Sequence, residues 1–173
     1  MRELRFERFN GSGEVPWLGA ANGGRMHLEI ERATPGDLEA LLPLVSAYRV
    51  FYEQRPDATR ERALIARHLE SGTSTVFIAR DGDRAVGFVQ LFQTYSTVAL
   101  GPQLILEDLF VDPIARGAGV AAKLLERAQA YAREIGSTGM FLETAMDNAA
   151  AQRVYERAGW TREGRFYKYN APG

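Results

Sequence analysis

The chain has 173 residues, of which 46% are hydrophobic and 25% charged, and its net charge is −1. This length and balance suit a single globular domain with a sizeable core, and the near-neutral charge gives no reason to expect nucleic acid as a partner. The chain has no cysteine and only two histidines, which excludes thiol nucleophiles, disulfides and thiolate metal sites. We therefore expect no metal centre.

Residues 1–25 show no sustained periodicity, and glycine, asparagine and proline recur among them. We expect a flexible N-terminal extension here, followed by one domain over residues 26–173. The alternative is an arm that packs on the domain or a partner through Phe6, Phe9 and Trp17. No apolar run reaches the roughly 18 residues of a membrane span, and the N-terminus lacks the apolar core of a signal peptide. We therefore expect a cytoplasmic protein without membrane contact.

The first part of the domain is predicted to be one strand followed by two helices. Alternating apolar and charged residues over 28–32 are typical of a half-exposed strand. Residues 34–37 form a capping box, with Thr34 as N-cap and Asp37 as its partner. The first helix would bury Leu38, Leu41, Leu42, Val45 and Tyr48. The second helix, over residues 59–70, would point Leu64, Ile65, His68 and Leu69 inward, with His68 as a packing residue.

The remaining elements alternate between strands and helices. Strands over 75–80 and 85–92 flank the hairpin signal Asp81-Gly82. The later strands are predicted over residues 104–111, 140–145, 160–163 and 165–169, the last two forming a closing hairpin, and the later helices over residues 120–135 and 148–158. The order β-α-α-β-β-β-α-β-α-β-β predicts an α/β fold, an α+β domain with a mixed sheet.

A glycine-rich loop, Arg116-Gly117-Ala118-Gly119, leads into a helix, and free N–H groups at a helix N-terminus favour an anion such as phosphate. No G-x-x-x-x-G-K-[ST] run is present, which argues against nucleoside triphosphate hydrolysis. Gly117, Gly119 and Ala122 fit a dinucleotide fingerprint. However, residues 112–116 separate the strand from the first glycine, and too little chain follows for that fold.

Two motifs resemble the GCN5-related N-acetyltransferases, the GNAT superfamily. Arg116-x-x-Gly119-x-Ala121 matches the pyrophosphate loop [QR]-x-x-G-x-[GA] of that family. The stretch from Asn148 to Trp160 is similar to the family segment N-x-x-A-x-x-x-Y-x-x-x-G-[FW]. The predicted element order also follows the family, whose fourth and fifth strands splay apart. The strand Leu104-x-Leu106-Glu107-Asp108-Leu109-Phe110-Val111 looks closest to the small-amine, diamine acetyltransferase-like branch.

This resemblance implies an acetyl-CoA-dependent N-acetyltransferase that acts on a primary amine of a small molecule by direct attack in a ternary complex. Polyamines, amino acids and aminoglycoside-like compounds are the implied acceptors, and a homodimer is implied because the family often forms dimers. The resemblance makes Glu107 the general base, directly or through water, and Tyr155 the general acid at the cofactor sulfur. Coenzyme A would be bound by Leu109, Phe110, Val111, Arg116, Gly117, Ala118, Gly119, Val120, Ala121, Asn148 and Tyr155.

The acceptor site is predicted from the segment between the first two helices and from the two adjacent carboxylates. Neighbouring strand residues face opposite sides, so Glu107 and Asp108 should diverge unless one lies in a bulge. A carboxylate in an apolar strand has a raised pKa, which suits a base at Glu107, although a structural pairing with arginine is the alternative. The predicted substrate-binding residues are Tyr48, Tyr52, Glu53 and Asp108, with Asp57 nearby, in an aromatic and acidic pocket for a cationic amine.

Three alternatives stay open from the sequence. The segment between the first two helices would alternatively be a solvated connection. The domain would alternatively be a non-catalytic acyl-CoA-binding sensor, although Glu107 and Tyr155 are both in place. The third alternative is an acetyltransferase of a protein or peptide amine. Such an enzyme needs an open groove, whereas the segment from Tyr48 to Pro56 suggests a closed pocket.

Overall fold

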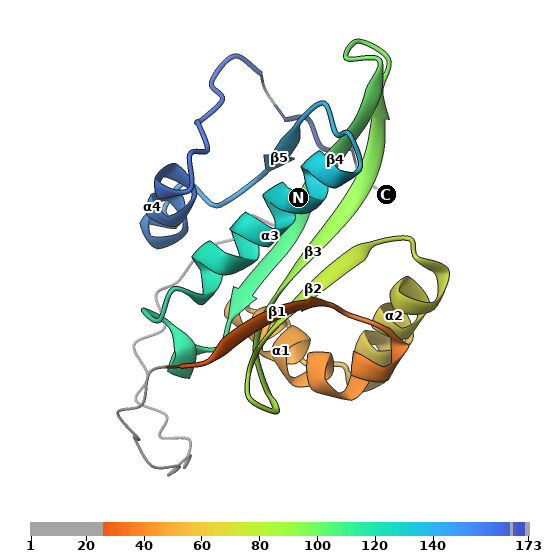
Figure 1. The fold of residues 1–173 in the computed structure, drawn as a ribbon, viewed down its shortest axis with the longest axis vertical. Coiled ribbons are helices and arrows are strands. Elements are labelled where there is room, and N and C mark those ends of the chain that lie inside the picture. Colours follow the sequence, from red (N-terminus) through yellow and green to blue (C-terminus); the bar gives the residue numbers. More distant parts are fainter. Residues whose placement is uncertain (1–25, 167, 172–173) are drawn as a thin grey trace.

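The computed structural model describes residues 26–166 and 168–171. The predicted extension, residues 1–25, lies outside these described residues. Within them, one five-stranded sheet has the order β1-β2-β3-β4-β5 (Figure 1). Its strands are β1 (Leu28–Arg32), β2 (Thr75–Asp81), β3 (Arg84–Ser96), β4 (Gly101–Val111) and β5 (Met140–Leu142). The first four strands are antiparallel to their neighbours, and β5 is parallel to β4.

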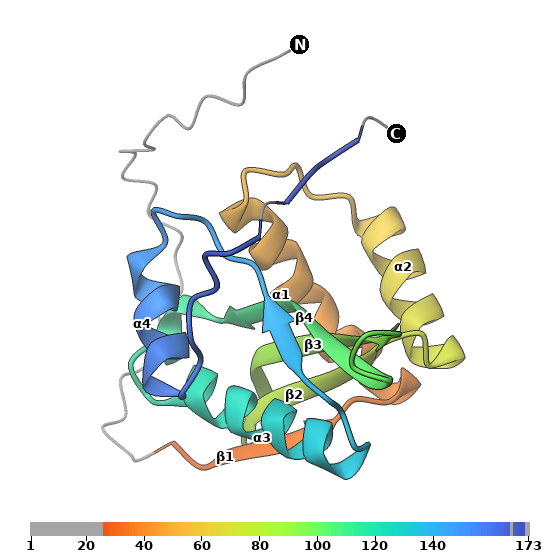
Figure 2. The same cartoon turned by 90° about the horizontal axis from the view of Figure 1, so that it is seen from above.

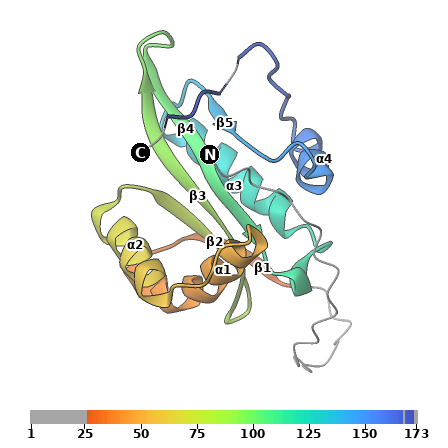
Figure 3. The same ribbon diagram turned by 180° about the vertical axis from the view of Figure 1, so that it is seen from behind.

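Helices cover both faces of this sheet. The helices α1 (Leu38–Phe51) and α2 (Ala58–Ser71) lie on one face, and α3 (Val120–Glu134) lies on the other, as Figure 2 shows from above. The helix α4 (Ala149–Arg157) lies beyond the end of β5, separate from α1 and α2 (Figure 3). Two short 3-10 turns, Pro35–Asp37 and Pro113–Ala115, precede α1 and the glycine-rich loop. No helix in the described part of the chain is long and apolar enough to cross a membrane.

Two hydrophobic cores result, one on each face. On the α3 face, Phe77, Val89 and Leu91 of the sheet pack with Leu124 and Leu125. On the opposite face, the sheet residues Ile78, Phe88 and Phe110 pack with Leu41, Leu44, Val45 and Ile65 of the two helices. Because the central strands are buried on both faces, they are nearly continuous apolar runs in the sequence.

The predicted fold class is confirmed, with corrections to the buried residues of the helices and to the chain end. Leu44 is buried in α1 while Leu42 is only half-buried, and Leu64 of α2 is 46% exposed. The predicted strand over 140–145 ends at Leu142. The closing hairpin is wrong: residues 161–166 and 168–171 contain no strand. There, the Glu163 carboxylate accepts hydrogen bonds from the Gly164 and Arg165 N–H groups, so a local turn replaces the ladder.

The strand β4 changes its pairing on both edges near its middle. Its register with β5 ends at Leu106, opposite Leu142, so residues 107–111 extend past the end of β5. On the other edge, Asp108 pairs with Gln90 and Leu106 with Leu91, which leaves Glu107 as the extra residue of a β-bulge. The predicted splay between the fourth and fifth strands is therefore present.

The bulge reverses which residues of β4 face which core. Before it, Leu104 and Leu106 pack on the α3 face. After it, Leu109 and Val111 pack on that face, and Phe110 joins the core under α1 and α2. One inserted residue changes the parity of an alternating strand, so both halves of β4 stay buried although the sheet diverges.

Gly87 lies on β3 at a point where β4 and α3 approach it closely. A Cβ at this position would lie 2.8 Å from the Phe110 carbonyl oxygen and 3.2 Å from Cγ1 of Val120. We expect Gly87→Ala to lower the free energy of unfolding by about 1–3 kcal/mol in chemical denaturation, because neither backbone nor helix can move away freely. Gly164→Ala, where no atom lies within 4 Å, is the control and should change it by less than about 0.5 kcal/mol. Equal stability of the two variants would contradict the packing described here.

Candidate active site

A cleft of about 690 Å³ opens where β4 and β5 diverge. Its walls are the C-terminal end of α1, the second half of β4, the loop before α3, the first half of α3, the β5–α4 loop and α4. The predicted site residues that line it are Tyr48, Tyr52, Glu107, Leu109, Phe110, Val111, Arg116, Gly117, Gly119, Val120, Ala121, Asn148 and Tyr155. The structure does not bring Glu53, Asp108 or Ala118 to this lining.

The glycine-rich loop turns the chain sharply between β4 and α3. Gly117 and Gly119 both have φ of 82°, in the left-handed region where a side chain is strained. Gly119 is the N-cap of α3, and its carbonyl accepts the hydrogen bond of the Lys123 N–H at 3.1 Å. The N–H groups of residues 120–122 therefore precede the intrahelical ladder and point out of the helix end. This arrangement suits a phosphate.

The side chain of Arg116 extends from the glycine-rich loop towards Phe51 at the end of α1. Its Nε donates to the Val111 carbonyl oxygen at 3.1 Å. Its guanidinium lies 5.9 Å from the ring centres of both Phe51 and Phe110. Stacking on two aromatic rings orients this cation at the edge of the cleft.

Tyr155 lies on α4, whose first turn is fixed by Asn148. The Asn148 Oδ1 accepts a hydrogen bond from the Ala151 N–H at 3.1 Å, so this side chain is an N-cap. The Tyr155 ring is half-buried, with its centre 6.2 Å from that of Trp160. Burial, with a smaller effect of Tyr52, raises the pKa of Tyr155 to about 12. At neutral pH the phenol is therefore protonated and able to donate.

The bulge separates the two adjacent carboxylates of β4. Glu107 is exposed and lines the cleft. Asp108 is turned away from the lining and half-buried beside Tyr48. Burial, together with the charge of Glu107, raises the pKa of Asp108 to about 6, although hydrogen bonding with Tyr48 lowers it in part. The apolar surroundings that the sequence predicted for Glu107 are thus found at Asp108, because Glu107 is the residue that bulges out.

Aromatic side chains at the end of α1 form the opposite wall of the cleft. The Tyr48 ring lies edge-to-face with Tyr52, with centres 5.1 Å apart, and 5.8 Å from Phe110. Phe51 in turn lies 5.2 Å from Tyr52. Burial, with the nearby charge of Asp108, raises the pKa of Tyr48. The Tyr48 hydroxyl therefore stays neutral and can only share hydrogen bonds.

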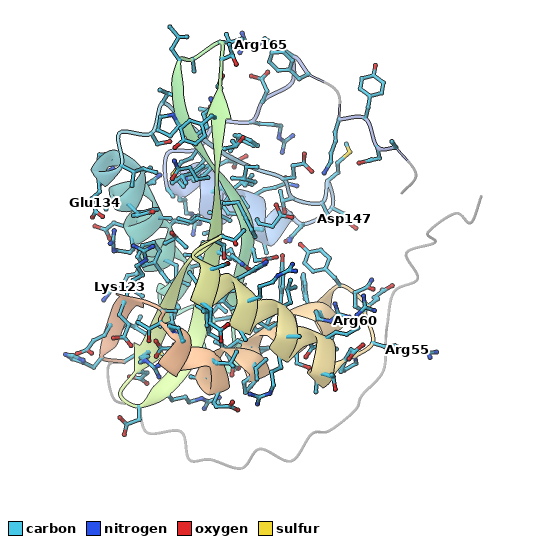
Figure 4. All side chains as sticks on the ribbon, turned by 90° about the vertical axis from the view of Figure 1, so that its right-hand side faces the viewer. Arg55, Arg60, Lys123, Glu134, Asp147 and Arg165 are labelled. Atoms are coloured by element: carbon cyan, nitrogen blue, oxygen red, sulfur yellow. The ribbon has the colours of Figure 1, made fainter. Side chains whose placement is uncertain are left out.

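An ion pair between a half-exposed arginine and a buried glutamate fixes the connection that carries this wall. Arg49 Nε lies 2.9 Å from Glu61 Oε1, and the Glu61 side chain is 4% exposed. The same oxygen accepts the Asp57 N–H, and the Arg49 Nη2 donates to the Arg55 carbonyl oxygen. Asp57 itself caps α2 by accepting the Arg60 N–H, so it does not serve the predicted acidic pocket. Figure 4 shows Arg55 and Arg60 on the same side of the molecule as Asp147 of the β5–α4 loop.

Besides Glu126 of α3, the sequence interpretation missed a second carboxylate of the cleft, Glu143. It follows β5 directly, one residue after Leu142, the last residue of β5 that pairs with β4. The available signal was the acidic residue near the end of a predicted strand beside the splay. His68, by contrast, lies outside the lining, where its Nδ1 is 2.8 Å from Gln90 Nε2 and its ring contacts Phe92.

The raised pKa of Asp108 predicts a pH dependence of stability. A carboxyl with a higher pKa in the folded state binds more protons when folded, so its contribution to stability falls as pH rises from about 4 to about 6. A rise from 3.8 to about 6 corresponds to about 3 kcal/mol, at about 1.4 kcal/mol per pKa unit.

We expect Asp108→Asn to remove this dependence. In denaturation curves collected between pH 4 and 7, the variant should gain stability relative to the parent protein as pH rises. Asp83→Asn, at an exposed turn position, should give a flat difference. A flat difference for Asp108→Asn as well would show that this carboxyl is not desolvated.

Known proteins resemble this chain over most of its length. The model of the family described as "Acetyltransferase (GNAT) family" matches residues 39–160. The uncharacterized N-acetyltransferase YhfO of Bacillus subtilis (strain 168) is 35% identical over 142 residues, which cover 82% of this chain and 95% of that protein. The thialysine N-epsilon-acetyltransferase of Caenorhabditis elegans is 26% identical over 110 residues, 64% of this chain and 68% of that protein. A crystal structure of a probable acetyltransferase, 34% identical, superimposes with a TM-score of 0.78, covering 83% of this chain and 97% of that one.

Proposed function

Since the chain belongs to the GNAT acetyltransferase family and is an acetyl-CoA-dependent N-acetyltransferase, we propose that it acetylates a primary amine of a small molecule. Polyamines, amino acids and aminoglycoside-like compounds are the proposed acceptors, and the amine attacks directly in a ternary complex. One observation supports this most: a single cleft joins the glycine-rich loop and Tyr155 to Glu107 and the aromatic wall of α1. A homodimer stays a prediction.

The residues along the cleft fit acetyl-CoA, whose bound form supplies a thioester carbonyl that an amine can attack. The loop from Arg116 to Ala121 offers N–H groups and a cation to the pyrophosphate, and its two glycines leave room for close approach. The free edge of β4 from Leu109 to Val111 offers backbone groups for strand-like pairing with the pantetheine arm. Asn148 lines the same cleft from the start of α4.

The chain's own residues would move two protons. Glu107, exposed in the cleft, would take a proton from the acceptor ammonium, directly or through water. A backbone N–H of β4 would donate to the carbonyl oxygen as negative charge develops on it. Tyr155, protonated at neutral pH, would donate to the departing sulfur, and the second proton that the nitrogen loses as the amide forms would restore the phenol.

The acceptor end of the cleft suits a small cation. Tyr48, Phe51 and Tyr52 supply aromatic faces, and Glu107 and Glu143 supply negative charge. The pair Arg49–Glu61 holds the α1–α2 connection in place. This arrangement favours a small amine over a peptide, which needs an open groove, and the name of the thialysine N-epsilon-acetyltransferase relative agrees with a small acceptor.

Substitution of the two proton-transfer residues tests the assigned roles. We expect Tyr155→Phe to lower kcat about 100-fold while the acetyl-CoA Kd changes less than about threefold, since the ring packing is kept. We expect Glu107→Gln to lower the rate mainly below the pKa of the acceptor amine, where a proton must be removed. Rates come from free-CoA release, and affinities from calorimetry.

The matched controls are the same types of substitution, Tyr to Phe and Glu to Gln, at exposed positions outside the cleft. Tyr95→Phe alters an exposed tyrosine of the β3–β4 hairpin, and Glu70→Gln alters an exposed glutamate of α2. Both should keep parental rates. If Tyr155→Phe and Glu107→Gln also keep them, the roles assigned here are wrong even though the fold is right.

The glycine-rich loop gives a separate test of cofactor binding. We expect Gly119→Ala to raise the Kd of CoA about tenfold, because a φ of 82° costs about 1–2 kcal/mol for an alanine and the loop would relax out of shape. Gly72→Ala is the control: Gly72 ends α2 with φ of 65°, and a Cβ there, as at Gly119, would have no atom within 4 Å. It should lower stability similarly and leave the CoA Kd unchanged.

A panel of acceptors tests the proposed substrate class. Free-CoA release is compared across polyamines, amino acids, aminoglycosides and short peptides. The proposal expects turnover with one of the first three groups at concentrations where peptides give none. Turnover with peptides alone would identify a peptide acetyltransferase, and binding of acetyl-CoA without turnover of any amine would identify a sensor.

A further inference from the structure

The chain places one of its own alkylammonium groups on a carboxylate of the cleft. After α4, the C-terminal segment runs past β5 towards the face of the sheet that α1 covers (Figure 2). In this segment Lys168 forms an ion pair with Glu143, in which its Nζ donates to Oε2. Because Glu143 lines the cleft, the ammonium lies at the edge of the proposed acceptor site.

Glu143 and the proposed base line the same cleft, each on one of the two diverging strands. Leu106 of β4 pairs with Leu142 of β5, and the next residue on each strand is a cleft-lining glutamate, Glu107 or Glu143. A diamine needs two different environments when one of its ends is acetylated. One nitrogen must lose its proton, while the other stays charged and is held by an anion.

The contact that now occupies Glu143 is weak. The side chains of Lys168 and Glu143 are 62% and 60% exposed, and an ion pair this open contributes little to stability. Nearer to α4 the segment is held by a separate hydrogen bond, from Arg162 Nη2 to Gln152 Oε1 at 2.9 Å. Lys168 can therefore leave Glu143 without releasing the whole segment from α4.

We propose that Glu143 binds the distal ammonium of a di- or polyamine acceptor, and that Lys168 is an internal competitor for this carboxylate. This inference rests on the proposed small-amine function and narrows its substrate class. Glu143 is then a specificity-determining residue. Lys168 tunes the acceptor affinity, because each acceptor must displace it.

The test compares 1,4-diaminobutane with 1-aminobutane, which has the same carbon chain and lacks the second nitrogen. We expect Glu143→Gln to raise the KM for 1,4-diaminobutane about fivefold, the ratio that corresponds to about 1 kcal/mol, with kcat unchanged. The KM for 1-aminobutane should stay the same. Glu156→Gln, at an exposed position of α4 outside the cleft, is the matched control and should change neither value.

Removal of the competitor should have the opposite effect. We expect Lys168→Ala to lower the KM for 1,4-diaminobutane about two- to threefold, and Lys168→Arg, which keeps a cation, to resemble the parent protein. In a Glu143→Gln background, Lys168→Ala should have no further effect, because the competition needs the carboxylate.

Two outcomes would overturn the inference while leaving the proposed function intact. One is an equal rise of KM for both amines in Glu143→Gln, and the other is a Lys168→Ala effect that persists without Glu143. Absence of turnover with any amine would instead count against the proposed function. In that case calorimetry of 1,4-diaminobutane with the CoA-loaded protein decides the inference, and equal Kd values for the parent protein and Glu143→Gln would overturn it.

Discussion

The site depends on two changes in the hydrogen-bond pairing of β4 near the middle of this strand. Pairing with β5 ends at Leu106, and the register with β3 shifts at Glu107. The first change exposes a strand edge, and the second turns one carboxylate into the cleft and its neighbour towards α1. Without the bulge, the alternation of β4 would exchange the faces of Leu109 and Phe110 and remove both from their cores. The same local irregularity therefore determines both the packing of β4 and which of its carboxylates lines the cleft.

The opposite wall of the cleft depends on a second constraint, the pairing of Arg49 with Glu61. A carboxylate as buried as that of Glu61 is costly unless its oxygens are satisfied, and here one oxygen meets both the guanidinium and the Asp57 N–H. The pair holds the end of α1 to the start of α2 and so positions the aromatic side chains from Tyr48 to Tyr52. The Tyr48 ring also packs against Phe110 of β4, with ring centres 5.8 Å apart, so this wall contacts β4 directly.

The features that the sequence predicts correctly are those with local causes. The Asn148 cap, the Asp81-Gly82 turn and the glycine-rich loop each depend on a few neighbouring residues, and all three lie at the predicted positions. The position of the bulge does not follow from the sequence, because β4 is apolar on both sides of Glu107 and the pattern of apolar residues does not mark where the extra residue lies. The closing hairpin is wrong because the Glu163 carboxylate satisfies nearby N–H groups that a strand would have paired. The place of Glu143 in the cleft depends on where β5 stops, which is a tertiary effect.

The division of labour among the carboxylates follows from an electrostatic conflict. Negative charge near an ammonium attracts it, but the same charge stabilises the protonated form and so opposes the loss of the proton that attack requires. Two features of the fold reduce this conflict. Asp108 is withdrawn behind Tyr48, where burial favours its neutral form up to about pH 6. Glu143 lies on the other strand, past the divergence, where it can hold a charge that must not be lost. Glu107 is then the one carboxylate of β4 that meets both solvent and cleft, and an exposed base can pass the proton on to water once it has taken it. The exposure of Glu107 therefore suits the proposed base, since water can carry the proton away from the cleft.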